Sequence, residues 1–279
     1  MFKKVFIILF ISLLAITCSK KEKNDKSKVI FTKENSKNLI KYIFDDNYFN
    51  TDPGFALDFS LSTIYLFNSN SISKINGNSE DTVFFANVVN GNDTVKVFYI
   101  KRLRSFYALF SGCLNEMMKT DYHYFTKCQM FGVDDKALTL EQVMAKKTVV
   151  KYKFDGEYDF TATSTSIKDT TSIMSKSNFG YTIDIVNKCT YNINGDADID
   201  LKINENKFYY TEIFKDFKIS ELEDYPEGIL RFEGANSSYI ELLFDGTNIV
   251  NMTVFDGNNT YTLTFNTETL IFNEGKYFY

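Results

Sequence analysis

The chain has 279 residues and a formal net charge of −5, and its first 28 residues hold seven Lys against two acidic residues. Residues 29–279 therefore carry a charge of −10. Such an acidic body argues against binding to nucleic acid, whose affinity comes largely from Lys and Arg on phosphates. The whole chain has 28 Phe and 18 Tyr, all but three of the Phe in this body, which can therefore bury the core of one large or two small domains without disulfides.

The first 17 residues have the composition of a secretory signal peptide. Lys3 and Lys4 precede an apolar run over 5–14, and residues 15–17 lead to Cys18. A charged start, a short apolar core and a cut after small residues are typical of an export signal. The run is too short to cross a bilayer as a helix, which needs about 20 apolar residues.

The stretch Leu13-Leu14-Ala15-Ile16-Thr17-Cys18 resembles the lipobox of bacterial lipoproteins. The family usually has Leu where Ala15 stands and Gly, Ala or Ser where Thr17 stands, and relaxed boxes of this kind are similar to those of spirochaete lipoproteins. The resemblance covers the first 18 residues. It implies cleavage before Cys18, acylation of its sulfur and attachment to a membrane of the cell envelope, periplasmic or surface-exposed. The alternative is a secreted protein with a chance cysteine at the cut.

Residues 18–28 form the predicted spacer between the anchor and the body. From Ser19 to Lys28 there are five Lys and two acidic residues but no apolar residue. Such a segment cannot bury enough surface to offset its ordering entropy, so we expect it to be disordered. Beside an anionic membrane, each Lys can add about 1 kcal/mol of attraction.

The body begins with a predicted helix near 34–45. Thr32 can cap it, Glu34 lies in its first turn, and apolar residues at 39, 40, 43 and 44 recur at helical spacing. From Phe55 the apolar period changes to two, which indicates a strand. Two further strand patterns, at 82–89 and 94–100, flank Asn90-Gly91-Asn92-Asp93, a strong hairpin signal.

Residues 102–147 have a different pattern and predict a helical insert. Leu103, Phe106, Tyr107 and Phe110 fit one helical face. Further along, apolar residues at 138, 140, 143 and 144 suggest a second, short helix with Thr139 near its start.

Strand patterning resumes at Val149 and is clearest after residue 178. Turn dipeptides such as Asp245-Gly246 and Asp256-Gly257 recur between short apolar stretches. The pattern predicts a mainly β (α+β) fold in which an antiparallel meander forms a sandwich or a barrel. A Ser- and Thr-rich stretch over 161–177 is either a linker or an exposed hairpin. The body is therefore an N-terminal β region, 29–165, with a C-terminal meander, 178–279, or one continuous domain, 29–279.

Three cysteines follow Cys18 in the exported chain. An oxidising compartment would permit a Cys113–Cys128 bridge, which closes a loop of about 15 residues and contributes about 3 kcal/mol. Cys189 would remain as a buried free thiol. A zinc site is not expected, because the chain has no C-x-x-C pair and a single histidine, His123.

The search for chemistry yields no catalytic, cofactor or metal site. Glycines are at least six residues apart, which excludes the glycine-rich phosphate loops and the G-x-S-x-G elbow. His123 is expected to be a packed or surface residue. Asp196, Asp198 and Asp200 share one side of a predicted strand, which favours a solvated acidic face over a weak calcium site.

These observations predict a lipid-anchored envelope protein with a non-enzymatic role in interaction or structure. The membrane is its expected partner through Cys18, with a protein as a further partner. A carrier of a small apolar ligand, held in a β-barrel or sandwich cavity, is the alternative. A hydrolase that uses carboxylates or His123 is the third hypothesis and has the least support.

Overall fold

The computed structural model describes residues 27–44, 75–85, 88–90, 93–113, 120–163, 171–187, 190–203, 205–220 and 222–274. Cys18, the signal peptide, nearly all of the spacer and the strand expected from Phe55 lie outside these residues. The elements in chain order are α2 (Lys33–Ile43), β1 (Ile75–Asn78), β2 (Thr82–Phe85), β3 (Val88–Asn90), β4 (Asp93–Ile100), the 3-10 turn η2 (Lys101–Leu103), β5 (Ser105–Cys113), β6 (Thr120–Phe131), α4 (Leu140–Met144), β7 (Lys151–Thr163), β8 (Thr171–Asn187), β9 (Thr190–Ile203), β10 (Asn206–Ser220), β11 (Glu227–Glu233), β12 (Tyr239–Asp245), β13 (Ile249–Phe255), β14 (Thr260–Asn266) and β15 (Phe272–Glu274).

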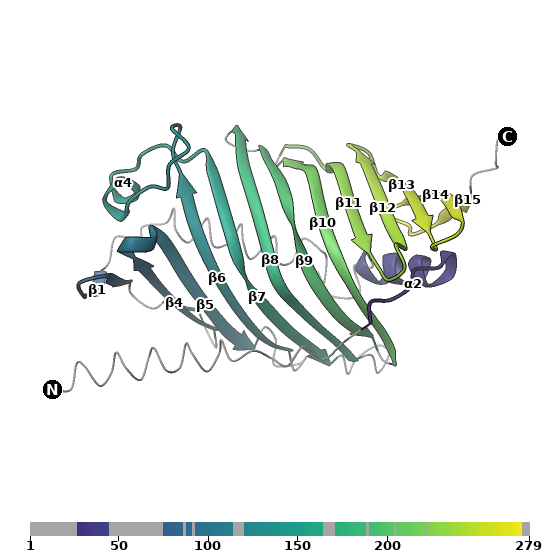
Figure 1. Cartoon of the computed structure of the whole chain (residues 1–279), viewed down its shortest axis with the longest axis horizontal. Helices are drawn as coiled ribbons and strands as arrows, with labels where there is room; N and C mark the ends of the chain where they lie inside the picture. Colours follow the sequence, from purple (N-terminus) through teal and green to yellow (C-terminus); the bar gives the residue numbers. More distant parts are fainter. Residues whose placement is uncertain are drawn as a thin grey trace.

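The strands form one antiparallel sheet in which nearly every strand pairs with its neighbours in sequence (Figure 1). Short β3 pairs only with β4, so the sheet passes directly from β2 to β4. The mainly β fold, the antiparallel meander and the N-terminal helix are thus confirmed. A sandwich would need a second sheet, and a barrel would need β1 to pair with β15; neither occurs among the described strands.

The Ser- and Thr-rich stretch contains the facing ends of β7 and β8. These strands pair from Lys151 opposite Asp184 to Thr163 opposite Thr171, on either side of residues 164–170. The sheet therefore continues from the first to the second half of the chain without a change of layer (Figure 1).

The helical insert expected over 102–147 is wrong for most of its described residues, because β5 occupies 105–113 and β6 occupies 120–131. Phe106 is buried in the core, whereas Tyr107 points to the opposite face and stacks on Phe98 at 5.0 Å between ring centroids. Large side chains on both faces hide the period of two, so that the apolar residues match helical spacing by coincidence. The short second helix is confirmed as α4, and Thr139 caps it through a reciprocal pair with Gln142.

One face of the sheet carries the core in rows of directly opposed side chains. A representative row crosses five strands through Tyr99, Phe106, Cys128, Phe154 and Tyr181, each at most 1% exposed. Opposed residues on one face of a sheet lie close enough to pack, so these rows hold neighbouring strands together.

The core row continues across β9 through a glycine. A Cβ on Gly195 would lie 2.0 Å from the backbone oxygen of Gly180, and its φ of +146° disfavours other residues. The missing side chain leaves room for Tyr181 to reach Phe214 on β10, with ring centroids 5.7 Å apart.

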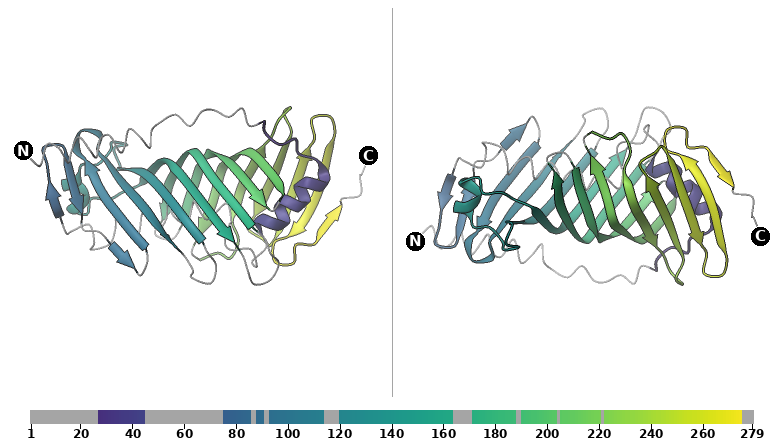
Figure 2. Two further views of the ribbon diagram at one scale, coloured as in Figure 1. Left: turned by 90° about the horizontal axis from the view of Figure 1, so that it is seen from below. Right: turned by 90° about the horizontal axis from the view of Figure 1, so that it is seen from above.

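Helix α2 covers the core face at the C-terminal end of the sheet (Figure 2). As expected, Thr32 is its N-cap and Glu34 lies in its first turn. Phe44, directly after the helix, packs against Phe244 and Phe265, and Lys33 forms an ion pair of 2.8 Å with Glu274. The helix therefore links the start of the body to its last strands.

Residues 28–31, named here the entry segment, fasten the chain to the sheet just before α2. Val29 N donates to the carbonyl of Tyr209 and its own carbonyl accepts from Ala235 N, both at 2.8 Å. Phe31 N donates to the hydroxyl of Ser238 at 3.0 Å, and the Phe31 ring is fully buried. The end of the predicted spacer is thus joined to the body at a fixed place.

Candidate functional site

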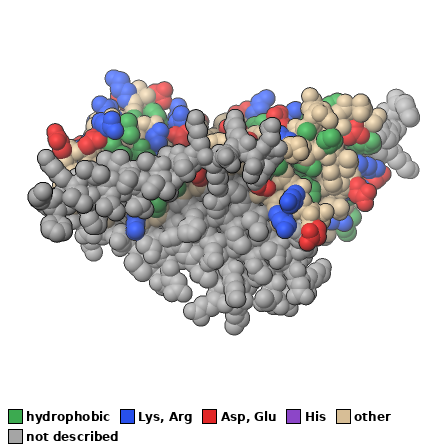
Figure 3. Space-filling view, turned by 60° about the horizontal axis from the view of Figure 1, so that its bottom comes forward, with side chains coloured by type: hydrophobic (Ala, Val, Ile, Leu, Met, Phe, Trp, Pro, Cys, Tyr) green, Lys and Arg blue, Asp and Glu red, His purple; other side chains and the backbone are tan. Residues whose placement is uncertain are grey.

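A pocket of about 650 Å³ lies where the loops around α4 meet the start of β5. Four cationic side chains line it, Arg104, Lys136, Lys146 and Lys147, together with one carboxylate, Asp134. Its formal charge is therefore +3, although the body as a whole is acidic. Figure 3 shows Lys and Arg side chains at the end of the molecule that carries α4.

Backbone hydrogen bonds hold the two loops of the pocket in shape. In the first loop, Gly132 N donates to Lys136 O at 3.1 Å, and Leu138 N donates to Met130 O at 2.8 Å. In the second, Lys147 N donates to Gln142 O at 3.0 Å. These hydrogen bonds fix the backbone at the pocket lysines, while the lysine side chains remain exposed.

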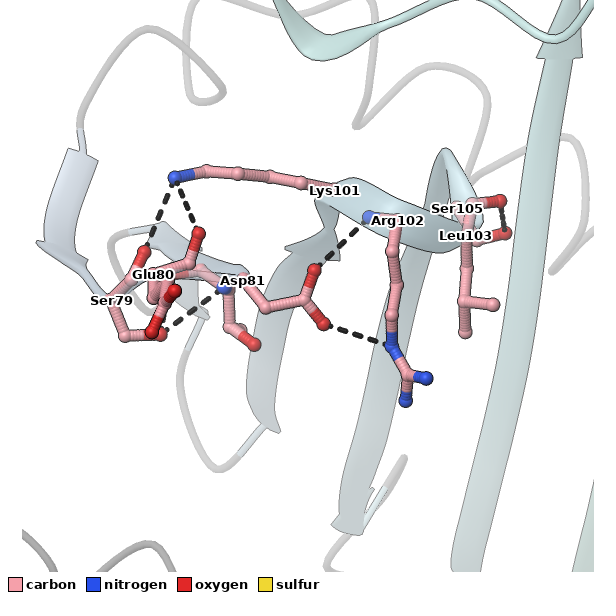
Figure 4. A network of polar contacts seen from close by, with 8 residues as sticks. Ser79, Glu80, Asp81, Lys101, Arg102, Leu103 and Ser105 are labelled. Carbon is pink, nitrogen blue, oxygen red and sulfur yellow. Dashed lines mark hydrogen bonds and ion pairs between the residues drawn. The ribbon is translucent and has the colours of Figure 1, made fainter.

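The third wall is the η2 turn, which ends at Arg104 in the left-handed region with a φ of 46°. The Arg104 guanidinium donates to the carbonyl of Ala137 at 3.0 Å, which ties this wall to the first loop. Before it, Arg102 forms an ion pair with Asp81 at 3.0 Å, and Lys101 bonds to the carbonyl of Ser79 at 3.2 Å (Figure 4). This network anchors the turn and therefore positions Arg104.

The pocket lysines differ from their neighbours in their pairing. Lys136, Lys146 and Lys147 have no ion pair within the described part of the chain. Close by, Lys151 forms an ion pair with Asp135 at 3.0 Å, and that hydrogen bond raises the pKa of Lys151. The pocket therefore concentrates uncompensated positive charge, to which an anion would be attracted.

A second polar feature lies inside the core face. Tyr181 donates its hydroxyl to the carboxylate of Glu212 at 3.3 Å, and both residues are only 1% exposed. Tyr210 is next to Glu212 on the same face, and its pKa is raised well above the usual value, first by burial and then by the Glu212 charge. A buried carboxylate is costly unless hydrogen bonds satisfy it, and Tyr181 provides one of them.

The proposed Cys113–Cys128 bridge is incompatible with the strand register. Cys128 lies opposite Phe106 on β5, whereas Cys113 lies opposite Asp121, seven residues further along β5. That offset is about 23 Å, and a disulfide needs Cα atoms within about 7 Å. Cys128 is a buried free thiol, and burial raises its pKa well above the usual range. Cys189 lies outside the described residues.

The other residues considered from the sequence lie on separate strands of the sheet. His123 lies on β6 opposite Ser111 and Asp159. On β9, Asp198 accepts hydrogen bonds from Thr211 at 2.9 Å and from Asn178 at 3.3 Å, on the face opposite the core. No group of three metal-ligating side chains occurs among the residues that the structure describes.

Sequence reasoning missed both the pocket and the buried pair. Glu212 occupies a core position in the alternating pattern of β10, between Tyr210 and Phe214, and this break in the pattern could have revealed it. The pocket had a weaker signal, the pair Lys146-Lys147 directly after a capped short helix. Its other members come from different segments, which only the fold brings together.

Comparisons with protein-family models, curated proteins and solved structures found no match to this chain. Within the described ranges, neither helix is long and apolar enough to cross a membrane.

Proposed function

We propose that this chain is a lipid-anchored lipoprotein of the bacterial envelope whose body binds a partner and has no catalytic role. The signal-like residues 1–17, Cys18 and the lysine-rich spacer support the anchor. The cationic pocket beside α4 supports a binding role. In this proposal the protein holds a recognition surface within a limited distance of the membrane.

The relative position of the entry segment and the pocket carries the proposal. Tracing the strand register from Tyr209, the partner of Val29, across β9 and β8 leads to Asp159 on β7. Asp159 is eight residues from Lys151, where β7 leaves the pocket loops, and is therefore about 26 Å away from it. Three strand spacings add about 14 Å across the sheet. The pocket and the entry segment are thus at opposite corners (Figure 1).

This arrangement favours a partner that approaches from outside the anchoring membrane. A spacer of about ten residues reaches at most about 35 Å when extended. A body held at its entry segment can then direct the α4 end away from the lipid surface. The carrier alternative requires apolar surface that a ligand can reach, but Phe154 and Tyr181 at the middle of the core face are at most 1% exposed.

The anchor is tested by growing the source cells, or an exporting bacterial host, with a clickable palmitate analogue. We expect the label on the wild-type protein in the membrane fraction, and its loss in Cys18→Ala. Label retained by Cys18→Ala, or unlabelled wild-type protein outside the membranes, would refute the anchor. The binding role is tested separately.

A photo-crosslinking amino acid at Val133, which is 81% exposed on the pocket rim, tests the binding role. Leu222 provides the matched control, because it is 80% exposed and lies in the turn between β10 and β11. On intact cells we expect a discrete adduct from Val133 and none from Leu222. Equal labelling from both positions would indicate random collision and would contradict a partner at the pocket.

A further inference from the structure

We propose that the pocket beside α4 binds the phosphate group of a small ligand. The inference rests on the proposed binding role of this pocket and names the chemistry that it recognises. It does not depend on the lipid anchor, because the residues that carry it belong to the folded body.

The charge balance of the pocket selects the class of ligand. Its formal charge of +3 exceeds what a single carboxylate would neutralise, whereas a phosphate monoester brings close to two negative charges. Lys136, Lys146 and Lys147 have no ion pair within the described residues, so a ligand need not displace an internal partner. Among the other Lys and Arg near this corner, Lys151 and Arg102 are already paired with Asp135 and Asp81.

The geometry supplies donors from three directions. Arg104 enters from the η2 turn, Lys136 from the loop before α4, and Lys146 and Lys147 from the loop after it. The Arg104 guanidinium has five N–H donors, and its bond to the Ala137 carbonyl fixes its orientation while others remain for a ligand. Cationic donors from three separate segments can each meet a different oxygen of a tetrahedral oxyanion, which accepts hydrogen bonds on all sides.

The volume indicates that the ligand is larger than phosphate itself. About 650 Å³ is within the range of small-molecule sites, which extends from about 300 to 1,000 Å³. The pocket also contains apolar side chains, among them Val133, Ala137 and Ala145. These can contact an uncharged part of the ligand while the cationic groups hold its phosphate.

The test measures binding to the exported protein, solubilised in an uncharged detergent, by calorimetry. The probes are inorganic phosphate, glycerol 3-phosphate and phosphatidylglycerol in mixed micelles. We expect saturable binding of the two soluble probes at one site. Binding of phosphatidylglycerol alone would assign the phosphate to a lipid headgroup and overturn a soluble ligand. No binding of any probe would overturn the phosphate site without touching the evidence for the anchor.

Charge variants locate the binding. Lys146→Gln and Lys147→Gln should each weaken phosphate binding about tenfold, the effect of losing one charge-assisted hydrogen bond. Lys136→Arg keeps the charge and should retain binding. Lys207→Gln is the matched control, because it removes one positive charge from an exposed position at the distant end of β10 and should leave phosphate binding unchanged. Unfolding curves that match wild type show that each variant is folded. Equal weakening by Lys207→Gln, or none by the pocket variants, would overturn the assignment.

Discussion

Replacing Gly234 by Ala should release the entry segment from the sheet. A Cβ at this position would lie 2.2 Å from the Val29 oxygen, 2.6 Å from the Ser238 hydroxyl and 3.0 Å from the Phe31 ring. Two of these contacts are too short to persist, so the segment must move away. The movement threatens three hydrogen bonds, each worth about 1 kcal/mol, and the burial of Phe31, worth about 2 to 3 kcal/mol.

These contributions sum to about 5 to 6 kcal/mol, and we expect Gly234→Ala to reduce the free energy of unfolding by up to about that amount, measured by urea denaturation. Trypsin should also cleave the variant after Lys33 at urea concentrations that leave the wild-type segment protected. Gly180→Ala is the matched control, since the nearest atom to its Cβ, an Asp155 carboxylate oxygen, is at 3.8 Å. A loss below about 1 kcal/mol for Gly234→Ala, or an equal loss for Gly180→Ala, would refute the role of this glycine.

Three further predictions concern titration, reactivity and the buried pair. Two lysines of α2 hold the pKa of Glu274 at about 2, below its ordinary value of 4.5, so this carboxylate stabilises the fold above about pH 4.5 and ceases to do so as the pH falls through 2. The stability difference between wild type and Glu274→Gln, followed by thermal melting, should vanish toward pH 2, and a difference independent of pH would contradict the assignment. Cys128 should react with iodoacetamide only after unfolding, as peptide mapping by mass spectrometry can establish; rapid alkylation of the native protein would mean that its burial is wrong. Tyr181→Phe removes a donor to the buried Glu212 carboxylate and should cost about 1.5 to 3 kcal/mol in urea denaturation, so an unchanged midpoint would show that the hydrogen bond is dispensable.

The sequence correctly predicted the helix and strands that bury one face and expose the other, because their apolar residues then recur at a regular spacing. Helix α2 has a polar outer side and a clear N-cap at Thr32, and the last strands alternate cleanly between Gly-containing turns. β5 was mistaken for a helix because Phe106 faces the core while Tyr107 stacks on the other side of the sheet. The single sheet could not be inferred from strand spacing, since closure depends on curvature and on the pairing of the first and last strands.

The candidate site could not be predicted from the sequence for a different reason. Arg104 lies more than thirty residues before Lys136, and no periodic pattern in the sequence connects them. Their segments are brought together by the fold, in which the Arg104 guanidinium donates a hydrogen bond to the carbonyl of Ala137. Glu212, in contrast, was visible as an acidic residue at an apolar position of an alternating strand. Only the register reveals that Tyr181, two strands away, supplies its hydrogen bond.

The entry segment also sets the order in which the molecule can be completed. Nearly every strand pairs with its neighbour in sequence, so the loops that must close are short and the sheet can grow hairpin by hairpin. Val29 is the exception, because its partner Tyr209 is 180 residues away, and Lys33 must wait for Glu274 near the end of the chain. Closing such long loops costs conformational entropy, and the contacts that offset this cost form only after the later strands have folded. A chain that emerges N-terminus first therefore keeps its entry segment unpaired until β10 and β11 have formed, and helix α2 gains its last contacts only when β15 is in place.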